Sequence, residues 1–281
     1  MISLIFLGTG GGRFTTISQA RATGGMYLYS DSTRVHIDPG PGALLRLRTS
    51  GLDPTKTTAL VVTHCHPDHC ADAMILVEAM THGCNKKRGI LAGSDSVMNG
   101  YENLGPVISK YHASKPAQVK LLKPNSSIEI DHLNMRALRT YHSDPTGIGL
   151  RISSPDGQIS ITGDTSLKEE IYREHSDCDV LVMSVTRPLR ARIPYHLSTE
   201  DAAALAEVVE PKLAILTHFG MKFIAANPET QARWVEKQTG VKTIAAWDGM
   251  SMVMRDSIPL VQKTISRQFV DSKKLSVELD E

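Results

Sequence analysis

The sequence predicts an α/β protein in which two sheets pack face to face and helices cover their outer surfaces. Its 281 residues suit one large domain or two small ones, and a chain of this length buries a sizeable core without disulfides. Charged residues make up 22% and hydrophobic residues 41%, which excludes a disordered chain. The first half is rich in short apolar runs, whereas such runs alternate with helical patterns in the second half. This change in pattern predicts the two packed sheets.

The predicted strands are short apolar runs bounded by Gly, Pro or polar residues. The first run ends at a Gly-rich turn, and the run 213–217 ends directly at a histidine. In chain order, we expect strands at residues 2–7, 25–29, 35–37, 59–63, 89–91, 127–130, 134–141, 149–153, 158–162, 180–185, 213–217, 243–246 and 250–254.

Helical patterns separate several of these strands, and we expect helices at 72–81, 167–175, 199–210 and 228–239. The third helix has the fullest set of signals. Ser198 caps it with Asp201 as the acidic capping-box partner, an apolar face of alanine, leucine and valine follows, and Pro211 ends it. Beyond the last strand the chain becomes more polar. We therefore expect one domain, 1–255, and a peripheral C-terminal tail, 256–281.

Composition and the absence of certain segments limit which partners the protein could bind and where in the cell it could be located. The 31 basic and 30 acidic side chains nearly cancel, which weighs against a bulk nucleic-acid or membrane-surface binder. The N-terminus lacks the basic and apolar regions of a signal peptide, and no apolar run approaches the roughly 18 residues that span a bilayer. The four cysteines form no CxxC motif and are expected to be reduced. We therefore expect a cytoplasmic protein with no membrane partner.

Eleven histidines against four cysteines make imidazole the main candidate metal ligand. His64, His66, Asp68 and His69 lie within six residues, just after the apolar run 59–62. A straight strand would direct alternate side chains to opposite faces, but a turn after Pro67 can gather them around a common centre. Two groups of ligands from one turn suggest two metals side by side.

Three more candidate ligands also follow predicted strands: His142, Asp164 and His218. Functional residues gather at strand ends because the sheet fixes them there while loops leave access for a substrate. Each position alone is weak evidence for a metal site. Asp164, for example, could simply cap the helix that follows. The joint pattern carries the prediction.

The motifs HCHPDH, TYHSDP, ITGDT and LTHFG, in that order, resemble the metallo-β-lactamase superfamily with its HxHxDH signature. The resemblance covers roughly residues 1–255. LGTGGG at the N-terminus, GIGLRI after His142, and His196-Leu-Ser-Thr before an Ala-rich helix are similar to the ribonuclease Z-like phosphodiesterase branch. The resemblance implies a four-layer αββα sandwich, the metallo-β-lactamase fold, and a dinuclear site, usually zinc and sometimes manganese or iron.

The resemblance also implies the ligand set. The first metal would take His64, His66 and His142, the second Asp68, His69 and His218, and Asp164 would bridge them. His66 favours a hydrolase, because an electron-transfer relative would have Glu there. The nitrogen and oxygen donors suit two divalent cations, most readily Zn²⁺, with Mn²⁺ or Fe as alternatives.

The implied reaction is hydrolysis through a metal-bridging hydroxide, which Asp68 could also orient. His196 would act as general acid or as a donor to a phosphate oxygen. Arg187, Arg190 and Arg192 could bind an anionic substrate, although a solvated loop is an equally good interpretation.

A phosphodiester, either a small molecule or an oligonucleotide, is the favoured substrate. The near-neutral charge and the absence of a long Gly/Pro-rich arm weaken the transfer RNA option. A lactone or thioester hydrolase and a non-catalytic metal-binding protein are the alternatives. A homodimer is left open.

Two segments remain without a firm role. The glycines at 8–12 predict a tight turn under the site rather than the start of a helix. Residues 101–116 contain a short helical stretch and could be a lid or a simple connection.

Overall fold

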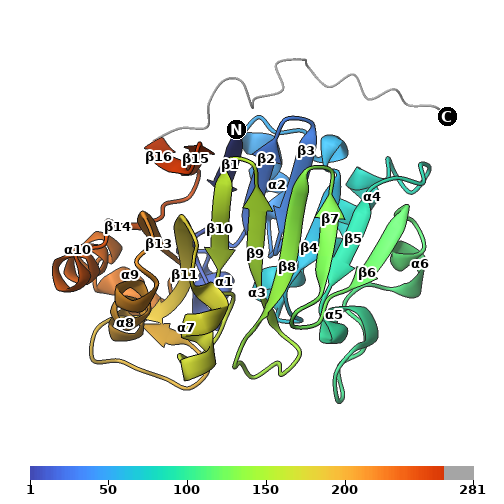
Figure 1. The fold of residues 1–281 in the computed structure, drawn as a ribbon. Coiled ribbons are helices and arrows are strands. Elements are labelled where there is room, and N and C mark those ends of the chain that lie inside the picture. Colours follow the sequence, from blue (N-terminus) through green and yellow to red (C-terminus); the bar gives the residue numbers. More distant parts are fainter. Residues whose placement is uncertain (263–281) are drawn as a thin grey trace.

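The computed structural model describes residues 1–262, and two eight-stranded sheets form its centre. Figure 1 shows both sheets with the helices around them. The first sheet has the strand order β16-β15-β1-β2-β3-β4-β5-β6. Its strands are β1 (Ile2–Phe6), β2 (Met26–Ser30), β3 (Thr33–Ile37), β4 (Ala59–Val62), β5 (Ile90–Gly93), β6 (Gln118–Leu121), β15 (Ser251–Arg255) and β16 (Ile258–Gln262).

The second sheet has the order β14-β13-β11-β10-β9-β8-β7, with β12 paired to β11. Its strands are β7 (Ser127–Ile130), β8 (Leu133–Arg139), β9 (Ile148–Ser154), β10 (Gly157–Ile161), β11 (Val180–Arg187), β12 (Leu197–Ser198), β13 (Leu213–Thr217) and β14 (Thr243–Ala245).

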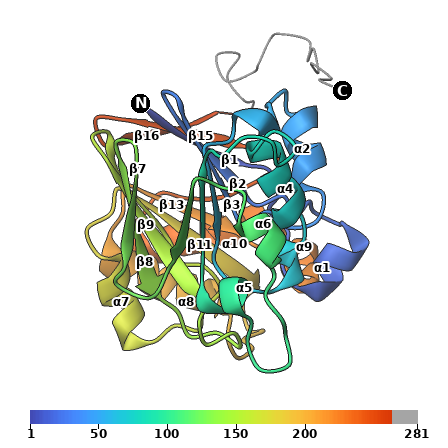
Figure 2. The same ribbon diagram turned by 90° about the vertical axis from the view of Figure 1, so that its right-hand side faces the viewer.

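Helices cover the outer face of each sheet, which gives four layers (Figure 2). The first sheet carries η1 (Pro54–Lys56), α2 (Ala43–Thr49), α3 (Pro67–Cys70), α4 (Ala73–Met80), α5 (Asp95–Asn99) and α6 (Lys110–Ala113). The second sheet carries α7 (Glu169–His175), α8 (Thr199–Val209), α9 (Met221–Ala225) and α10 (Pro228–Thr239). A further short helix, α1 (Arg13–Ser18), follows the Gly-rich loop after β1.

Three apolar clusters hold these layers together. One lies between the sheets and joins side chains such as Leu4 and Val61 to Met135 and Ile161. The others join each sheet to its own helices, as at Leu76 on α4. Burial of apolar surface is the main stabilising contribution in such interfaces. The predicted αββα sandwich is confirmed.

The strand directions bring the ends of separate strands together. In the second sheet, β10, β11 and β13 are parallel, and β8 runs with them because β9 is antiparallel to both β8 and β10. The carboxyl ends of these four strands therefore lie at one edge of the sheet. Loops that leave this edge are well placed to form a site.

Short or exposed elements differ most from the sequence predictions. Helix 228–239 and strands 127–130 and 213–217 were predicted with the observed bounds. Strand β6 was missed because all four of its side chains are exposed, so no buried alternation marks it. The expectation that no helix begins after the glycines was wrong, since α1 starts at Arg13.

The predicted tail also requires a correction. Residues 258–262 form β16, which pairs antiparallel with β15 and extends the first sheet beyond residue 255. Its apolar side chains Ile258 and Leu260 are exposed, so the segment lacks the signal of a buried strand. The remaining part of the predicted tail, 263–281, lies outside the described residues.

Segment 101–116 contains a β-bridge between Tyr101 and Leu104, then α6. It follows α5 and precedes β6, and none of its residues lines the cavity described below. The structure therefore places it as a connection between β5 and β6. Among the described residues, no helix is long and apolar enough to cross a bilayer.

Candidate metal centre

The loop after β4 places four of the predicted ligands. His64 and His66 lie in the extended segment that leaves the strand, and Pro67 starts the single turn of α3. Asp68 and His69 lie within that turn, which is closed by the His69 amide donating to the His66 carbonyl at 2.9 Å. Pro67 suits the first helical position because its fixed φ matches the helix and no amide hydrogen is needed there.

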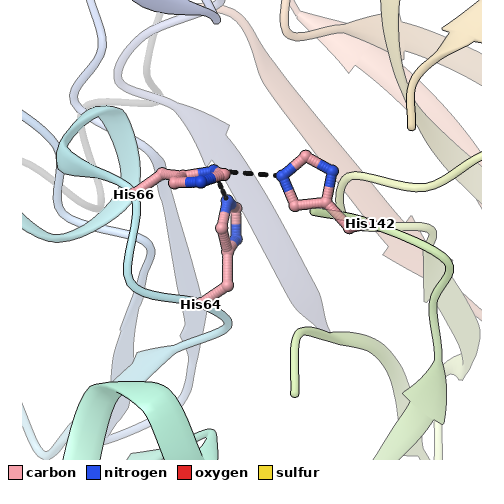
Figure 3. Close-up of side chains that lie close together, drawn as sticks. All are labelled: His64, His66 and His142. Atoms are coloured by element: carbon pink, nitrogen blue, oxygen red, sulfur yellow. Dashed lines mark hydrogen bonds between the residues drawn. The ribbon is translucent and has the colours of Figure 1, made fainter. Parts of the chain in front are cut away.

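Three imidazoles converge to form the first group. His66 Nδ1 lies 3.1 Å from His64 Nε2 and 3.0 Å from His142 Nε2. Figure 3 shows His64 and His142 directed at His66. His142 comes from the loop after β8 in the other sheet. The two sheets therefore meet at this group.

The second group joins α3 to the loop after β13. His69 Nε2 lies 3.0 Å from His218 Nε2, and Asp68 Oδ2 lies 3.3 Å from the same His218 atom. All of these ligand atoms are within 4.8 Å of one another.

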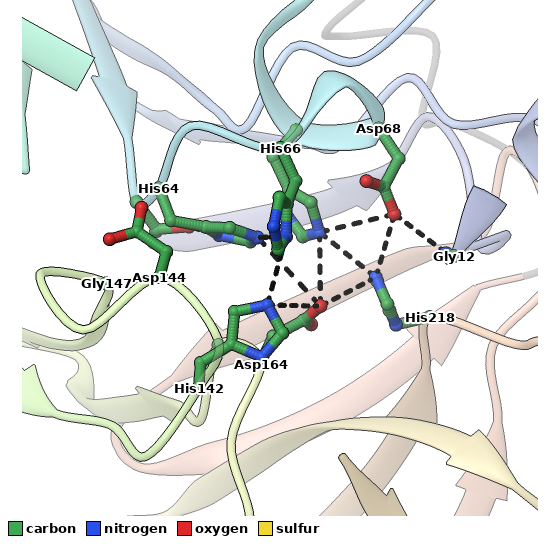
Figure 4. Close-up of polar contacts among 12 residues, drawn as sticks. Gly12, His64, His66, Asp68, His142, Asp144, Gly147, Asp164 and His218 are labelled. Carbon is green, nitrogen blue, oxygen red and sulfur yellow. Dashed lines mark hydrogen bonds and ion pairs between the residues drawn. The ribbon is translucent and has the colours of Figure 1, made fainter. Parts of the chain in front are cut away.

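Asp164, from the loop after β10, lies between the two groups (Figure 4). Its Oδ2 is 3.3 Å from His218 Nε2 and 3.6 Å from His69 Nε2 in the second group. The same oxygen is 4.0 Å from His64 Nε2 and from His142 Nε2 in the first group. This carboxylate is therefore placed to be shared by both groups.

Four of the histidines have a second hydrogen-bond partner that fixes the ring. His69 Nδ1–H donates to Asp38 Oδ2 at 3.0 Å, and His142 Nδ1–H donates to the Tyr195 carbonyl at 3.1 Å. These partners only accept, so each ring turns Nε2 towards the cluster, and in the neutral form that atom has a free electron pair. Such outer partners orient the ring and raise the basicity of a metal ligand.

Two threonine hydroxyls contact the other pair of rings. Thr63 Oγ1 donates to Asp38 Oδ2 at 2.7 Å and lies 3.1 Å from His64 Nδ1, so it accepts from that ring. Thr186 Oγ1 lies 2.9 Å from His218 Nδ1. All four rings therefore direct Nε2 at the centre, and only His66 directs Nδ1.

The donor set fits divalent cations. The ring nitrogens lie only 3.0–3.1 Å apart. With all rings neutral and their electron pairs directed inward, such nitrogens would repel one another, whereas a cation between them would bind them all. Two nitrogen ligands of one tetrahedral Zn²⁺ are about 3.3 Å apart, given bonds of about 2.0–2.1 Å. In addition, Asp164 Oδ1 is buried and has no hydrogen-bond partner within residues 1–262.

Charge inside the site keeps the two carboxylates ionised. Burial alone would raise the pKa of Asp164, but His218 and His69 hold that pKa well below its usual range. The same balance holds for Asp68, where burial opposes a lowering of the pKa by His69 and His218. Both side chains therefore present negatively charged oxygens to a cation.

The Gly-rich loop after β1 packs directly on the second group. The Gly12 amide donates to Asp68 Oδ2 at 2.7 Å. A Cβ at Gly11 would lie 2.2 Å from His218 Cδ2, so only glycine fits there. Pairing of Gly10 with Phe219 brings this loop, and α1 after it, against the segment that contains His218.

A cavity of about 790 Å³ opens above the centre. His66, Asp68, Asp164 and His196 line its floor. His196 Nδ1 lies 3.3 Å from Thr186 Oγ1 and 3.6 Å from Asp164 Oδ2. Burial lowers the pKa of His196 to about 4, so this imidazole is neutral near pH 7.

The structure separates the three arginines of the predicted substrate loop. Arg187 lines the cavity, whereas Arg190 and Arg192 do not. Arg192 instead pairs with Asp201 at 2.7 Å, and the Arg190 amide donates to Glu200. The spacing of the three arginines could not show this separation, because it contains no information on the acidic side chains at the start of α8.

Two cavity-lining cations were missed by the sequence analysis. Arg13 is the first residue of α1, and Lys222 is the second residue of α9. Their proximity depends on the contact between the Gly-rich loop and Phe219, which local sequence patterns do not encode. Lys222 lies four residues after the candidate ligand His218. This short spacing was the only feature of the sequence that indicated a cation near the cavity.

Together, the four-layer fold and the His/Asp cluster are those of a metal-dependent hydrolase of the metallo-β-lactamase type. Residues 33–219 match the family model described as the beta-lactamase superfamily domain. The chain belongs to this superfamily.

Relatives and solved structures agree with this assignment. An uncharacterized protein of Methanocaldococcus jannaschii is 40% identical over 253 residues, which cover 89% of this chain and 94% of that protein. A ribonuclease Z of Pyrobaculum neutrophilum is 24% identical over 258 residues, which cover 79% of this chain and 88% of that protein. The solved structure of the metallo-beta-lactamase fold protein YhfI of Bacillus subtilis has the same fold, with a TM-score of 0.72 and 18% identity. The match covers 89% of this chain and 98% of that protein.

Proposed function

We propose that this protein is a dinuclear metal-dependent hydrolase that cleaves a phosphodiester. The observation that carries the proposal is the composition of one cavity. Its floor is the His/Asp cluster, and its walls hold Arg13, Arg187 and Lys222. None of these three cations forms an ion pair within residues 1–262, so their charge is available to an anionic substrate. Similarity to a ribonuclease Z supports the same class of substrate.

In this proposal each of the two groups would hold one divalent cation, and Asp164, which faces both groups, would contribute to both. The first position uses His64, His66 and His142, and the second uses Asp68, His69 and His218. A bound pair of cations lowers the pKa of a shared water and polarises the phosphoryl group. The nitrogen and oxygen donors suit Zn²⁺, Mn²⁺ or Fe.

Asp68 and His196 would act on the reacting groups. The Gly12 amide fixes one Asp68 oxygen, which leaves the other to orient the attacking water. Thr186 Oγ1 accepts from His218 Nδ1–H and can therefore direct its own hydrogen to His196 Nδ1. His196 then carries its hydrogen on Nε2, as a donor to a phosphate oxygen or to the leaving oxygen.

The three wall cations would bind the phosphate before the reaction. Arg187 Nε is buried without a hydrogen-bond partner within the described chain, so a bound anion would satisfy it. A guanidinium group matches phosphate oxygens through paired N–H donors. The size of the cavity favours a small phosphodiester over a folded RNA.

The proposal is tested by turnover of metal-loaded protein on four substrates. The panel is bis-p-nitrophenyl phosphate, a cyclic dinucleotide, a precursor transfer RNA and a lactone. We expect cleavage of at least one phosphodiester. In His196→Ala, turnover should fall by about 100-fold or more while metal content stays unchanged, as for loss of a proton donor.

His82→Asn is the matched control, since His82 is exposed and does not line the cavity. It should leave turnover and metal content unchanged. Cleavage of the lactone without any phosphodiester would overturn the substrate class. Loss of metal together with activity in His196→Ala would overturn the donor role.

A further inference from the structure

One wall of the cavity is apolar and exposed, although it adjoins a highly polar floor. Phe14 and Ile17 of α1 are 77% and 80% exposed, and Met221 of α9 is 42% exposed. All three line the cavity. Phe14 and Ile17 are three residues apart, so both side chains lie on the same side of α1. Exposed apolar groups gathered in one cavity mark a binding surface.

The two helices form this wall jointly. Ser18 Oγ on α1 lies 3.6 Å from Met221 Sδ on α9, so the helices are in contact. Each helix also contributes one cation next to its apolar residue, Arg13 beside Phe14 and Lys222 beside Met221. The wall therefore offers a positive charge and an apolar surface side by side.

We propose that the substrate of this site is a small phosphodiester that carries an aromatic ring, and that the ring packs on Phe14. This inference rests on the proposed function. The anionic phosphate would lie between the cluster and the three wall cations, and the ring would cover the Phe14–Ile17 face. A phosphodiester with only polar substituents would leave that face in water. Aromatic side chains stack with any planar base or aryl group, because every such ring has a π face.

The cavity size supports a low-molecular-weight ligand. A volume of about 790 Å³ lies within the roughly 300–1,000 Å³ typical of small-molecule sites. It accommodates a nucleotide-sized diester with one or two rings. Phe14 thus determines specificity, whereas the cluster and the cations act on the phosphate common to all diesters.

Two substrates that share a leaving group test the inference. In both methyl p-nitrophenyl phosphate and phenyl p-nitrophenyl phosphate, the proposed reaction directs the leaving p-nitrophenyl group to His196. The two substrates differ only in the retained group, which is the part that would pack on Phe14. In the wild type, kcat/KM should favour the phenyl diester by about 5- to 150-fold, the range expected for stacking of one ring. Phe14→Ala should reduce this ratio towards one, and Phe14→Tyr should restore it.

Two further variants separate binding of the ring from binding of the phosphate. Arg13→Gln should lower kcat/KM for both diesters and leave their ratio unchanged. Leu45→Ala removes a similarly exposed side chain on α2 that does not line the cavity, and it should change neither value.

Calorimetric titration with diphenyl phosphate and dimethyl phosphate gives a readout that does not need turnover. The wild type should bind the diphenyl ester more tightly, and Phe14→Ala should bind the two alike. If the wild type has equal kcat/KM for the two p-nitrophenyl diesters and equal affinity for diphenyl and dimethyl phosphate, ring binding is overturned and the proposed function is not affected. Ring-selective binding without cleavage of any diester would instead overturn the proposed function.

The apolar wall could also be an interface between two copies of the chain, and the same variants decide this. A dimer in the wild type that becomes a monomer in Phe14→Ala, with no change in selectivity, would contradict ring binding. Light scattering on both proteins measures the oligomeric state.

Discussion

The floor and the wall of the cavity are built in opposite ways. On the floor, ligand side chains such as His64 and Asp164 are buried, and four of the five histidines are held by a second partner. On the wall, Phe14 and Lys222 are exposed, and Lys222 has no ion-pair partner within residues 1–262. A preorganised floor suits chemistry, which requires fixed geometry. A wall without internal partners suits recognition, because its groups are left for the ligand.

The largest expected effect is at the centre of the floor. Asp164→Asn removes the charge of a carboxylate that faces both ligand groups. Changes to residues that only hydrogen-bond to a metal ligand lower metal affinity or activity by up to roughly 100-fold. In Asp164→Asn, metal affinity and turnover should each fall by more than this. Metal analysis of the purified variant and its turnover on bis-p-nitrophenyl phosphate measure both effects.

Asp177→Asn is the control for this substitution, because Asp177 is exposed and its positive φ of 59° is one that Asn tolerates. It should behave as the wild type. Full metal content and unchanged turnover in Asp164→Asn would contradict the shared-ligand assignment.

An intermediate effect is expected at Asp38, which contacts the imidazole of His69 on the floor. Asp38 accepts from the Thr63 amide and hydroxyl, each at 2.7 Å, and from His69 Nδ1–H. Asp38→Asn keeps the shape and tolerates the φ of 54°, but it removes the negative charge. Metal affinity should fall by about 10- to 100-fold.

Competition with a chelator measures that affinity. The position that contains His69 should weaken most, because Asp38 contacts that ring directly and reaches His64 only through Thr63. An equal loss at both positions would show that Asp38 supports the whole loop rather than one imidazole. Unchanged affinity would show that the ring needs no anchor.

The smallest effect is expected on the wall. Lys222→Gln removes one exposed cation, so KM for a phosphodiester should rise by only about 2- to 5-fold with kcat unchanged. The effect should shrink as salt is added, because exposed charges are screened. Arg190→Gln is the control, since Arg190 does not line the cavity. A large fall in kcat in Lys222→Gln would place this lysine on the floor rather than the wall.

The floor was predictable from sequence, and the wall was not. His64 and His69 follow an apolar strand within a dense local motif, and His218 follows another such strand, so local patterns placed them. Helix α1 has only six residues and directs Phe14 and Ile17 outward, so no apolar periodicity towards the core marks it. The contact between Gly10 and Phe219 is tertiary and has no local signal.

The charged side chains show the same limit. Arg187 ends β11 and lines the cavity, whereas Arg192 lies outside it and pairs with Asp201. Ion pairing across a loop depends on how the loop folds back on α8. Sequence spacing therefore could not tell which of the three arginines lines the cavity.

The metal stoichiometry of the reloaded wild-type protein tests the central claim most directly. Protein stripped with a chelator and titrated with Zn²⁺ should bind two ions per chain, and phosphodiester turnover should rise with occupancy. Fewer than about 0.5 ion per chain after reloading, or turnover that is independent of metal, would contradict the account.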